Sequence, residues 1–409
     1  MDEITIGLRL RTLRRWRGMK QAELAGLAGI SQSYLSMAER GQRAIDNRWI
    51  IADLASALQI SESDLTGGPH LTQDPLQARP HATVAALRFA LTSAELGESA
   101  VDRARPIGDL RALMRRDGRT FGPIERAWRA NDYITMGQLL PDVIDELHWH
   151  IADPADEATH RAALNTMVDA AMGAAGLARI LGYPDLGHIG AAKAAEAAAR
   201  LGDPLARGKA MYAFARSDGG DWSRAARRAQ QEFSRFQAAA GSSEDYQVLG
   251  MLALNASMAA AASRDSDTAR ALLDEAAEIA ELVPDDIDRN WQSFSATNVA
   301  VWRIKIGVEL GESGGKMLEL AEDVDESKLE SYPARKANFL TEVGRGLARE
   351  RRTRRHAEQW LLKAEKAGPQ RFRNNSRVKE VVAVALEQDR VAASSRELRG
   401  IASRLGIPH

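Results

Sequence analysis

Apolar residues recur along most of the chain at the spacing of amphipathic helices. Stretches rich in Ala and Leu end at Gly, Pro or Asp, whereas alternating strand patterns are almost absent. Residues 67–80, GGPHLTQDPLQARP, contain three prolines and two glycines and therefore favour a linker over a helix. We predict an all-α protein with a first domain at 1–66, a linker at 67–80 and a larger domain at 81–409.

Five short helices are predicted for the first domain. Their expected ranges are about 6–17, 21–28, 32–40 and 47–58, with a fifth short helix after Ser61. Gly29 can take the positive φ of a tight turn between the second and third helices, and Ser31 can cap the third through its hydroxyl. Burial of Leu35 and Ala38 leaves an outer face on the third helix, made of Gln32, Ser33, Tyr34, Ser36 and Met37.

The order and spacing of these features resemble a known class of DNA-binding domain. QAELA at 21–25, AGIS at 28–31, and ERG at 39–41 followed by Arg43 stand at the spacing of the Cro and lambda-repressor type of helix-turn-helix, the XRE family, with no insertion. The resemblance covers the whole first domain and implies that its third helix enters the major groove of DNA. Lys20 departs from the family, which usually has a Ser or Thr there to cap the second helix.

The resemblance also implies roles for single side chains. Gln32, Ser33 and Met37 would face the bases, and Gln21 would meet a phosphate at the start of the second helix. The chemistry agrees, because a glutamine amide can pair with adenine N6 and N7 and a methionine can contact a thymine methyl group.

Further contacts with the DNA backbone are expected from side chains that carry a positive charge or an amide. Such contacts set the register on DNA without reading its sequence. The ones we expect are Lys20, Arg43 and Asn47. For the bases between Arg9 and Arg17, a solvated face and direct contact with DNA both stay open.

Charge is distributed unevenly, although the 409 residues carry 55 Lys and Arg against 56 Asp and Glu. Residues 6–48 hold nine bases and three acids, residues 49–344 hold 30 and 44, and residues 345–404 hold sixteen and seven. The first segment suits a polyanion such as double-stranded DNA, and the acidic middle does not. The basic C-terminal segment could add DNA contacts, dock on the acidic middle or form a solvated face.

Several chemistries are excluded or disfavoured by the residues present. The chain has no cysteine, which rules out disulfides, thiolate catalysis and Cys-ligated metal sites. His148 and His150 are two residues apart and so lie on different faces of a helix, and no phosphate loop or nucleophile elbow follows a strand. We expect no metal, no cofactor and no enzymatic activity.

The sequence predicts neither export nor membrane anchoring. The first residues, MDEITIGLRLRTLRRW, lack the apolar core of a signal peptide, and no later apolar run is long enough for a membrane span. We expect a cytoplasmic protein that associates with the nucleoid when it is bound to DNA.

Antiparallel helix pairs are predicted to recur in the larger domain. The second helices of four pairs lie within 183–204, 220–236, 266–284 and 354–369. They resemble tetratricopeptide repeats: Ala357, Leu361, Ala364 and Pro369 match the spacing of that repeat in full, and Ala269, Leu273 and Ala276 match it without the proline. The resemblance covers about residues 160–370 and implies a solenoid of helical hairpins. A generic helical bundle is the alternative.

Regulators that join such a headpiece to tetratricopeptide-like helices resemble the peptide-sensing RRNPP group. In that group an oligopeptide lies along the concave face built from the first helices of the pairs, which implies a peptide or small-molecule effector. Asparagine amides can donate to and accept from a peptide backbone. The residues expected on this face are Asn165, Tyr212, Asn255, Asn298, Trp302 and Asn338, together with Trp291. Ordinary interhelix asparagines and core aromatics are the alternative.

These features together predict a sequence-specific bacterial transcription regulator. One such headpiece buries little surface on DNA, so we expect a homodimer, formed by the helical domain, on a palindromic operator with half-sites ~34 Å apart. The alternative is a DNA-tethered scaffold whose repeats bind a protein partner and no small effector. Release from DNA by an effector would favour the regulator, and stable co-purification with another protein would favour the scaffold.

Overall fold

The computed structural model describes residues 5–68, 75–99, 101–114, 121–215, 221–389 and 395–407. Within these residues the secondary structure is helical, and the only pairing of extended backbone is an isolated bridge between Leu96 and Glu98. The predicted all-α fold is confirmed. None of the helices in these ranges has the length and apolar character that a bilayer crossing requires.

The headpiece, residues 5–66, consists of five helices. They are α1 (Ile6–Trp16), α2 (Gln21–Leu27), α3 (Gln32–Glu39), α4 (Arg48–Leu58) and α5 (Glu62–Thr66). The first four agree with the predicted ranges to within one residue at each end. Their apolar faces meet in one core, with fully buried leucines at Leu10, Leu24, Leu35, Leu54 and Leu65.

Gly7 allows α1 to cross α3 at close range. A Cβ atom at this position would lie 1.9 Å from the carbonyl oxygen of Ala38 in α3. Since real Cβ contacts are much longer, any larger residue would push the two helices apart.

The body, residues 75–407, is built of many helices. In chain order they are α6 (Pro75–Ala82), α7 (Val84–Thr92), α8 (Ile107–Met114), α9 (Pro123–Ala130), α10 (Tyr133–Ala152), α11 (Glu157–Ile180), α12 (Pro184–Leu201), α13 (Pro204–Ala215), α14 (Trp222–Gln237), α15 (Ser243–Ala262), α16 (Ser266–Ala280), the 3-10 helix η1 (Trp291–Ser293), α17 (Ala296–Leu310), α18 (Gly314–Glu322), the 3-10 helix η2 (Glu326–Leu329), α19 (Pro333–Ala348), α20 (Arg354–Ala367), α21 (Pro369–Arg373), α22 (Ser376–Asp389) and α23 (Arg396–Arg404).

Helical hairpins are the repeating unit of the body. The four predicted second helices are α12, α14, α16 and α20, and each packs against the helix before it. The end of the predicted linker overlaps a helix, because α6 already begins at Pro75. A proline suits the first turn of a helix, whose N–H groups have no partner within the helix. Residues 69–74 of the predicted linker lie outside the described residues.

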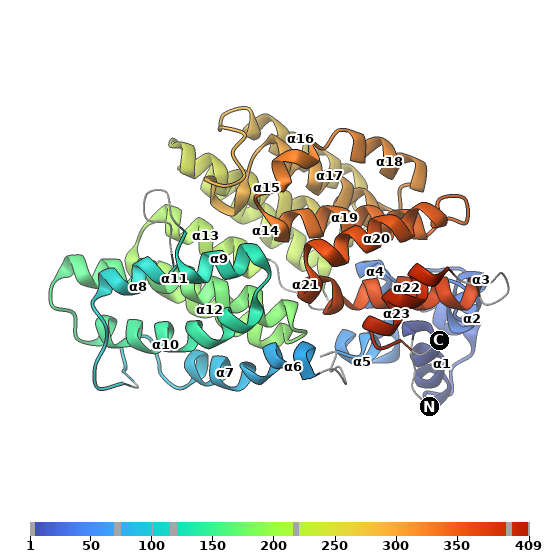
Figure 1. Cartoon of the computed structure of the whole chain (residues 1–409), viewed down its shortest axis with the longest axis horizontal. Helices are drawn as coiled ribbons and strands as arrows, with labels where there is room; N and C mark the ends of the chain where they lie inside the picture. The colour runs from blue at the N-terminus through green and yellow to red at the C-terminus, as the bar shows by residue number, and fades with distance from the viewer. Residues whose placement is uncertain are drawn as a thin grey trace.

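The body closes on itself instead of remaining an open row of hairpins. Helix α9 packs against α19, and the backbone N–H of Tyr133 in α10 donates to Gln370 Oε1 in α21 at 3.1 Å. Figure 1 shows the chain leaving the headpiece through α6 and α7, turning through α14 to α16 and returning through α19 to α23. The first and last described helices, α1 and α23, therefore both lie at the headpiece end of the molecule.

Candidate nucleic-acid interface

The turn between α2 and α3 has the predicted helix-turn-helix geometry. Gly29 has a φ of 61°, in the left-handed region that glycine tolerates. The hydroxyl of Ser31 accepts a hydrogen bond of 3.1 Å from the backbone N–H of Tyr34 and so caps α3. Helix α2 lacks a hydroxyl cap, and Glu23 instead reaches back to the backbone N–H of Lys20 at 3.3 Å.

A buried ion pair fixes α3 against α1 and α2. The Arg14 guanidinium donates to both oxygens of Glu39, at 2.5 and 2.8 Å, and Gln21 Nε2 donates to the same carboxylate at 2.7 Å. Burial favours the neutral carboxyl, yet the hydrogen bonds from Arg14 and Gln21 outweigh it and lower the pKa of Glu39. Gln21, expected to meet a phosphate, therefore also holds the three helices in register.

The outer edge of α3 presents two exposed polar side chains. Gln32 and Ser33 are exposed, while Ser36 and Met37 are half-buried. Because Gln32 lies on the first turn of α3, its amide can extend beyond the helix end toward a partner. The roles of these four residues as base-reading side chains stay predictions that their positions allow.

Tyr34 departs from the predicted base-reading face. Its hydroxyl donates to the carbonyl oxygen of Ala44 at 3.1 Å, and the Arg43 guanidinium lies 4.5 Å from the centroid of its ring. Burial raises the pKa of the Tyr34 hydroxyl, which therefore remains a hydrogen-bond donor. We correct its role accordingly: Tyr34 supports the loop after α3.

The basic residues of α1 divide into two groups. Arg9 donates to the carbonyl oxygen of Leu65, and Arg17 donates to that of Leu58, both at 3.0 Å. Arg9 and Arg14 of α1, and Arg17 directly after it, thus donate hydrogen bonds within the headpiece, although Arg17 is exposed, as Arg15 is. Lys20 and Arg43 are exposed as well, so their predicted phosphate contacts are sterically open.

The loop between α3 and α4 docks on the body through Asp46. This carboxylate accepts from Arg345 and from Arg349 of the C-terminal half, each at 3.0 Å. Asp46 is 2% exposed and Arg345 is 1% exposed. Burial alone would raise the pKa of Asp46, but the two arginine charges outweigh it and hold that pKa below its ordinary value. Two arginines of the basic C-terminal segment, Arg345 and Arg349, thus dock on the headpiece.

Asn47, expected to contact a phosphate, is also part of this docking interface. Its Nδ2 donates to the carbonyl oxygen of Glu309 in α17 at 2.9 Å, and its Oδ1 accepts from Arg349 at 3.0 Å. The neighbouring Arg48 forms a salt bridge with the buried carboxylate of Glu309. Both ends of the Asn47 amide are engaged by the body, so we replace the phosphate role by docking.

A second docking contact lies at the turn between α2 and α3. Arg264, in the loop between α15 and α16, donates to the carbonyl oxygen of Ala28 at 3.1 Å and forms a salt bridge with Asp53. Its guanidinium also lies 3.9 Å from the centroid of the Trp49 ring. The body therefore holds the headpiece close to the start of α3.

Glu380 of α22 provides the third docking contact. One oxygen accepts from the backbone N–H of Ile6 at 2.7 Å, and the other accepts from that of Ile45 at 3.1 Å. Burial among apolar neighbours raises the pKa of Glu380 to about 7. We refer to the contacts of Asp46, Asn47, Arg48, Arg264 and Glu380 as the docking interface.

The predicted effector residues are not brought together at one groove. Asn255 is buried and donates to the backbone carbonyl of Tyr212 at 2.9 Å, while the Asn298 side chain points to Met251 and Gln292. Trp302 lies in a core cluster, Asn338 is bonded to Arg371, and Asn165 lines a small separate pocket with Arg161. Asn255, Asn298 and Asn338 thus bond to other elements of the body, which is the alternative that the sequence left open. Of the residues expected on the effector face, Tyr212 and Trp291 line a cavity of about 590 Å³ at the η1 turn.

Sequence reasoning missed the docking interface. Its strongest signal was Glu380, a single carboxylate directly before the apolar run VVAVAL, since an acid in such a setting needs a buried partner. Its partners, Ile6 and Ile45, donate through their backbone N–H groups. Because almost every residue has such a group, the sequence could not identify these two as the partners.

Comparison with known proteins gives one match. A family model described as a helix-turn-helix domain matches residues 5–66. No significant match was found among curated proteins or among solved structures. The chain thus carries an N-terminal helix-turn-helix domain, followed by a helical body whose resemblance to tetratricopeptide repeats stays a prediction.

Proposed function

We propose that this chain is a sequence-specific DNA-binding transcription regulator that acts in the bacterial cytoplasm. The observation that carries the proposal is the exposed edge of α3, where Gln32 and Ser33 follow a glycine turn and a serine cap. A helix held this way by a buried ion pair at Glu39 can enter the major groove without losing its own packing. Exposed Lys20 and Arg43 supply positive charge beside that edge.

The body is proposed to join two chains and to fix the distance between their headpieces. Buried ion pairs at Asp46 and Glu309 attach the headpiece firmly, so it does not hang on a free linker. In a homodimer formed through the body, the separation of the two α3 helices would follow from the body alone. A palindromic operator with one preferred half-site spacing is the expected target.

Regulation is proposed to act on this docking, without a chemical reaction. An effector that binds the body in one arrangement better than in another would shift the position of the headpiece and with it the preferred operator. The amount of the shift is limited by the difference between the two affinities.

The proposal is tested by selecting duplexes from a random pool with the full-length chain. We expect enrichment of a two-fold symmetric site, bound at least about a thousandfold more tightly than random competitor at moderate salt. Sedimentation on the selected duplex should show two chains per site. Equal binding to all duplexes, or no binding, with and without culture extract, would refute the regulator function.

A further inference from the structure

A cavity of about 590 Å³ lies where the two halves of the body close on each other. One wall comes from α9, α11 and α13, and the opposite wall is the η1 turn. Trp128 of α9 lines the cavity and packs against the apolar cores of both halves. The volume is within the ~300–1,000 Å³ range of small-molecule sites.

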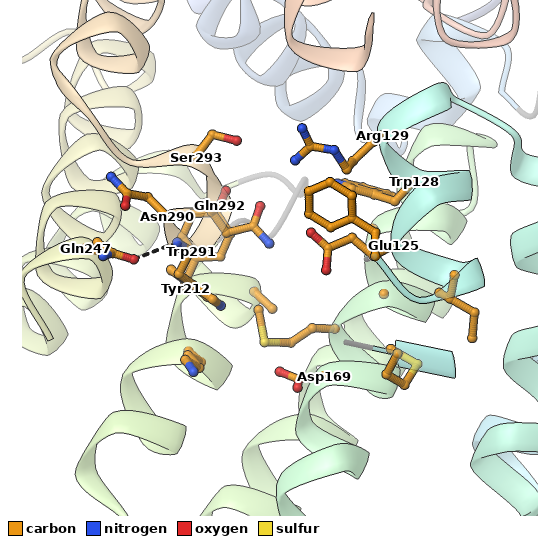
Figure 2. Close-up of a pocket in the computed structure, with 18 of the residues that line it drawn as sticks. Glu125, Trp128, Arg129, Asp169, Tyr212, Gln247, Asn290, Trp291, Gln292 and Ser293 are labelled. Atoms are coloured by element: carbon orange, nitrogen blue, oxygen red, sulfur yellow. Dashed lines mark hydrogen bonds between the residues drawn. The ribbon is translucent and has the colours of Figure 1, made fainter. Parts of the chain in front are cut away.

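Aromatic rings approach the cavity from opposite walls. Trp291 of the η1 turn packs edge-on against Tyr212 of α13, with ring centroids 5.2 Å apart. Figure 2 shows these two rings on one side of the space and Trp128 on the other. Gly176 of α11 makes room for Trp128, because a Cβ atom at this position would lie 2.9 Å from the indole ring. Rings on both sides favour a flat aromatic ligand between them.

The charged residues of the lining balance one another. Four are acidic and four are basic. Arg129 forms a salt bridge with Asp288, and Lys209 forms one with Glu244. The others also have partners within the protein: Glu125, Asp169, Arg179 and Arg289. A charged ligand would have to break such a pair or remain without a counter-charge, and both cost free energy at a partly desolvated site. The lining therefore favours an uncharged ligand.

Two polar side chains of the η1 turn remain available to a ligand. The Ser293 hydroxyl is buried and has no hydrogen-bond partner among the described residues. The half-buried Gln292 bonds through its backbone carbonyl, and its side-chain amide makes no hydrogen bond within the described part of the chain. Figure 2 shows both side chains directed toward the wall that carries Trp128. A ligand with a donor and an acceptor would satisfy groups that otherwise cost free energy.

The η1 turn is held in an unusual backbone conformation at the cavity. Gln292 and Ser293 have φ values of 50° and 60°, a region that residues with side chains rarely adopt. The turn is fixed from α15, where Gln247 Oε1 accepts from the backbone N–H of Trp291 at 2.6 Å, and from α19, where Arg335 donates to the carbonyl oxygen of Gln292. Such conformations cluster at ligand sites because the surroundings must enforce them.

Two helices lead from this turn to the docking interface. Helix α17 begins three residues after Ser293 and carries Glu309, the partner of Arg48, near its other end. Helix α19 follows Tyr332 of the cavity wall and carries Arg345, which bonds the loop before α4. A displacement of the η1 turn would therefore act on helices that both end at the headpiece.

We propose that this cavity binds an uncharged, flat aromatic molecule whose edge carries a hydrogen-bond donor beside an acceptor, as a carboxamide does, and that such a molecule is the effector of the regulator. The rings contact its faces, and Gln292 with Ser293 bonds its polar edge. The role as effector rests on the proposed function, whereas the binding itself does not.

The preference for an uncharged ligand is tested with benzamide, benzoate and benzamidinium, which have nearly the same shape and carry no charge, a negative charge and a positive charge. Ligand-observed NMR titration of the full-length chain gives their dissociation constants, weak ones included. We expect benzamide to bind at least about tenfold more tightly than either ion, because the ions would have to disturb paired charges. Equal or tighter binding of either ion, or no binding of benzamide, would overturn the proposal.

Gln292→Met and Ser293→Ala test the polar edge of the site. Each should weaken benzamide binding roughly fivefold, the loss expected for one hydrogen bond. Neither group bonds another described residue, so thermal unfolding of the ligand-free variants should not occur at a lower temperature. Gln231→Met and Ser234→Ala, at exposed positions of α14, are the matched controls and should leave binding unchanged. Unchanged benzamide affinity in both test variants would overturn the proposal.

Trp128→Leu and Trp291→Leu test the aromatic walls. Each should weaken benzamide binding, and thermal unfolding checks that the variant is folded. Cyclohexanecarboxamide gives a measure that needs no variant, because it carries the same amide on a ring that is not flat. It should bind the unaltered chain more weakly than benzamide does, and equal affinity for the two would overturn the requirement for a flat aromatic body.

The role as effector is tested by hydrogen exchange at the backbone N–H groups of Ile6 and Ile45, which are bonded to Glu380 in the docked headpiece. A ligand that binds the η1 turn in its present conformation favours the docked arrangement, so saturating benzamide should slow this exchange several-fold. At the same concentration the effect should be smaller in Gln292→Met. Unchanged or faster exchange with benzamide bound would overturn the effector role. Since no DNA enters these measurements, failure of the chain to bind DNA would refute the proposed function separately.

Discussion

The carboxylate of Glu380 accepts a 2.7 Å hydrogen bond from the backbone N–H of Ile6, a residue 374 positions earlier in the chain. The first N–H groups of a helix have no partner within that helix, and a negative charge is favoured beside them. Glu380 therefore acts on α1 as a capping residue supplied by the opposite end of the protein. Its second oxygen bonds Ile45 in the same way, before α4.

Docking is predicted to weaken as the pH rises from about 4.5 to about 7. In the docked headpiece burial raises the pKa of Glu380 to about 7, whereas its ordinary value is 4.5. The docked state therefore binds a proton more tightly. The stability that this proton adds to docking is complete below pH 4.5 and is lost as the pH rises through 7, which weakens the docking equilibrium by up to roughly 300-fold. The pH effect of Asp46 on docking has the opposite sign. Because its pKa is lowered in the docked state, its contribution to docking is lost only when the pH falls below about 4.

Hydrogen exchange of the Ile45 amide, corrected for its intrinsic pH dependence, measures this effect. Glu380→Gln keeps the side-chain shape without the titration, so it should flatten the profile between pH 5 and 7.5. Glu281→Gln, at an exposed position after α16, is the matched control and should retain it. A wild-type profile that is flat in this window would refute the role given to Glu380.

Arg345→Met is predicted to lower the free energy of unfolding by ~3–5 kcal/mol. The guanidinium is 1% exposed and faces two carboxylates, Asp46 and Glu342, which the substitution would leave buried without their main cation. Urea unfolding measures the change. Arg289→Met, whose side chain is 72% exposed, should change stability by less than ~0.5 kcal/mol. Equal effects of the two substitutions would show that the buried pair adds no stability.

Loosening the docking interface is predicted to relax the choice of half-site spacing. In Arg264→Ala/Arg349→Ala the contacts with Ala28, Asp53 and Asp46 are lost, while α3 itself is untouched. Affinity for an isolated half-site should stay within about twofold, and preference between spacings should fall about tenfold, equivalent to ~1.4 kcal/mol. Binding to duplexes with half-sites moved by one to five base pairs gives the measurement. A loss of half-site affinity with unchanged spacing preference would contradict it.

Base reading and phosphate contact are predicted to separate in two substitutions. Gln32→Ala should remove ~1–3 kcal/mol of discrimination at one base pair, because the amide can pair with only one base edge. Arg43→Ala should weaken binding to all duplexes alike and reduce the salt slope by ~0.9. Binding to all single-base variants of the selected site, at several salt concentrations, distinguishes these results. Ser56→Ala, on the exposed face of α4, serves as the control, and the opposite assignment of effects would overturn both roles.

Gly7→Ala is predicted to destabilise the headpiece by ~1–3 kcal/mol, as overpacked cores do. The new methyl group would meet the Ala38 carbonyl at 1.9 Å and move α1 away from α3. Gly26→Ala is the matched control in α2, where nothing lies within 4 Å of the new methyl group. There the better helix propensity of alanine should stabilise the chain by up to ~1 kcal/mol. Thermal unfolding of the two variants should shift in opposite directions.

The headpiece was predictable because its determinants are local. Gly29 and Ser31 fix the ends of adjacent helices through their own backbone and hydroxyl, so the sequence around them is sufficient. The same holds for the helices of the body, whose apolar period and proline starts can be read within one turn or two. Packing of distant elements has no such local signal.

The docking interface and the cavity depended on contacts between segments far apart in the chain. Asn47 was expected to contact DNA from its place before α4, but its amide donates to Glu309, a residue 262 positions later in the chain. The asparagines of the first helices were correctly placed on helices, yet Asn255 turns into the hairpin core because a neighbouring backbone carbonyl needs a donor. The cavity depends on the unusual η1 turn, whose backbone conformation could not be predicted from the sequence WQS.

The position of Glu380 also sets an order of events on the ribosome. Ile45 leaves the exit tunnel 335 residues before Glu380 does, an interval of roughly 20 to 70 s at ordinary rates of bacterial synthesis. During that interval the headpiece of the nascent chain lacks its two bonds to Glu380, and a prematurely terminated product would lack them permanently. Only a molecule translated through α22 can have its headpiece docked in this way.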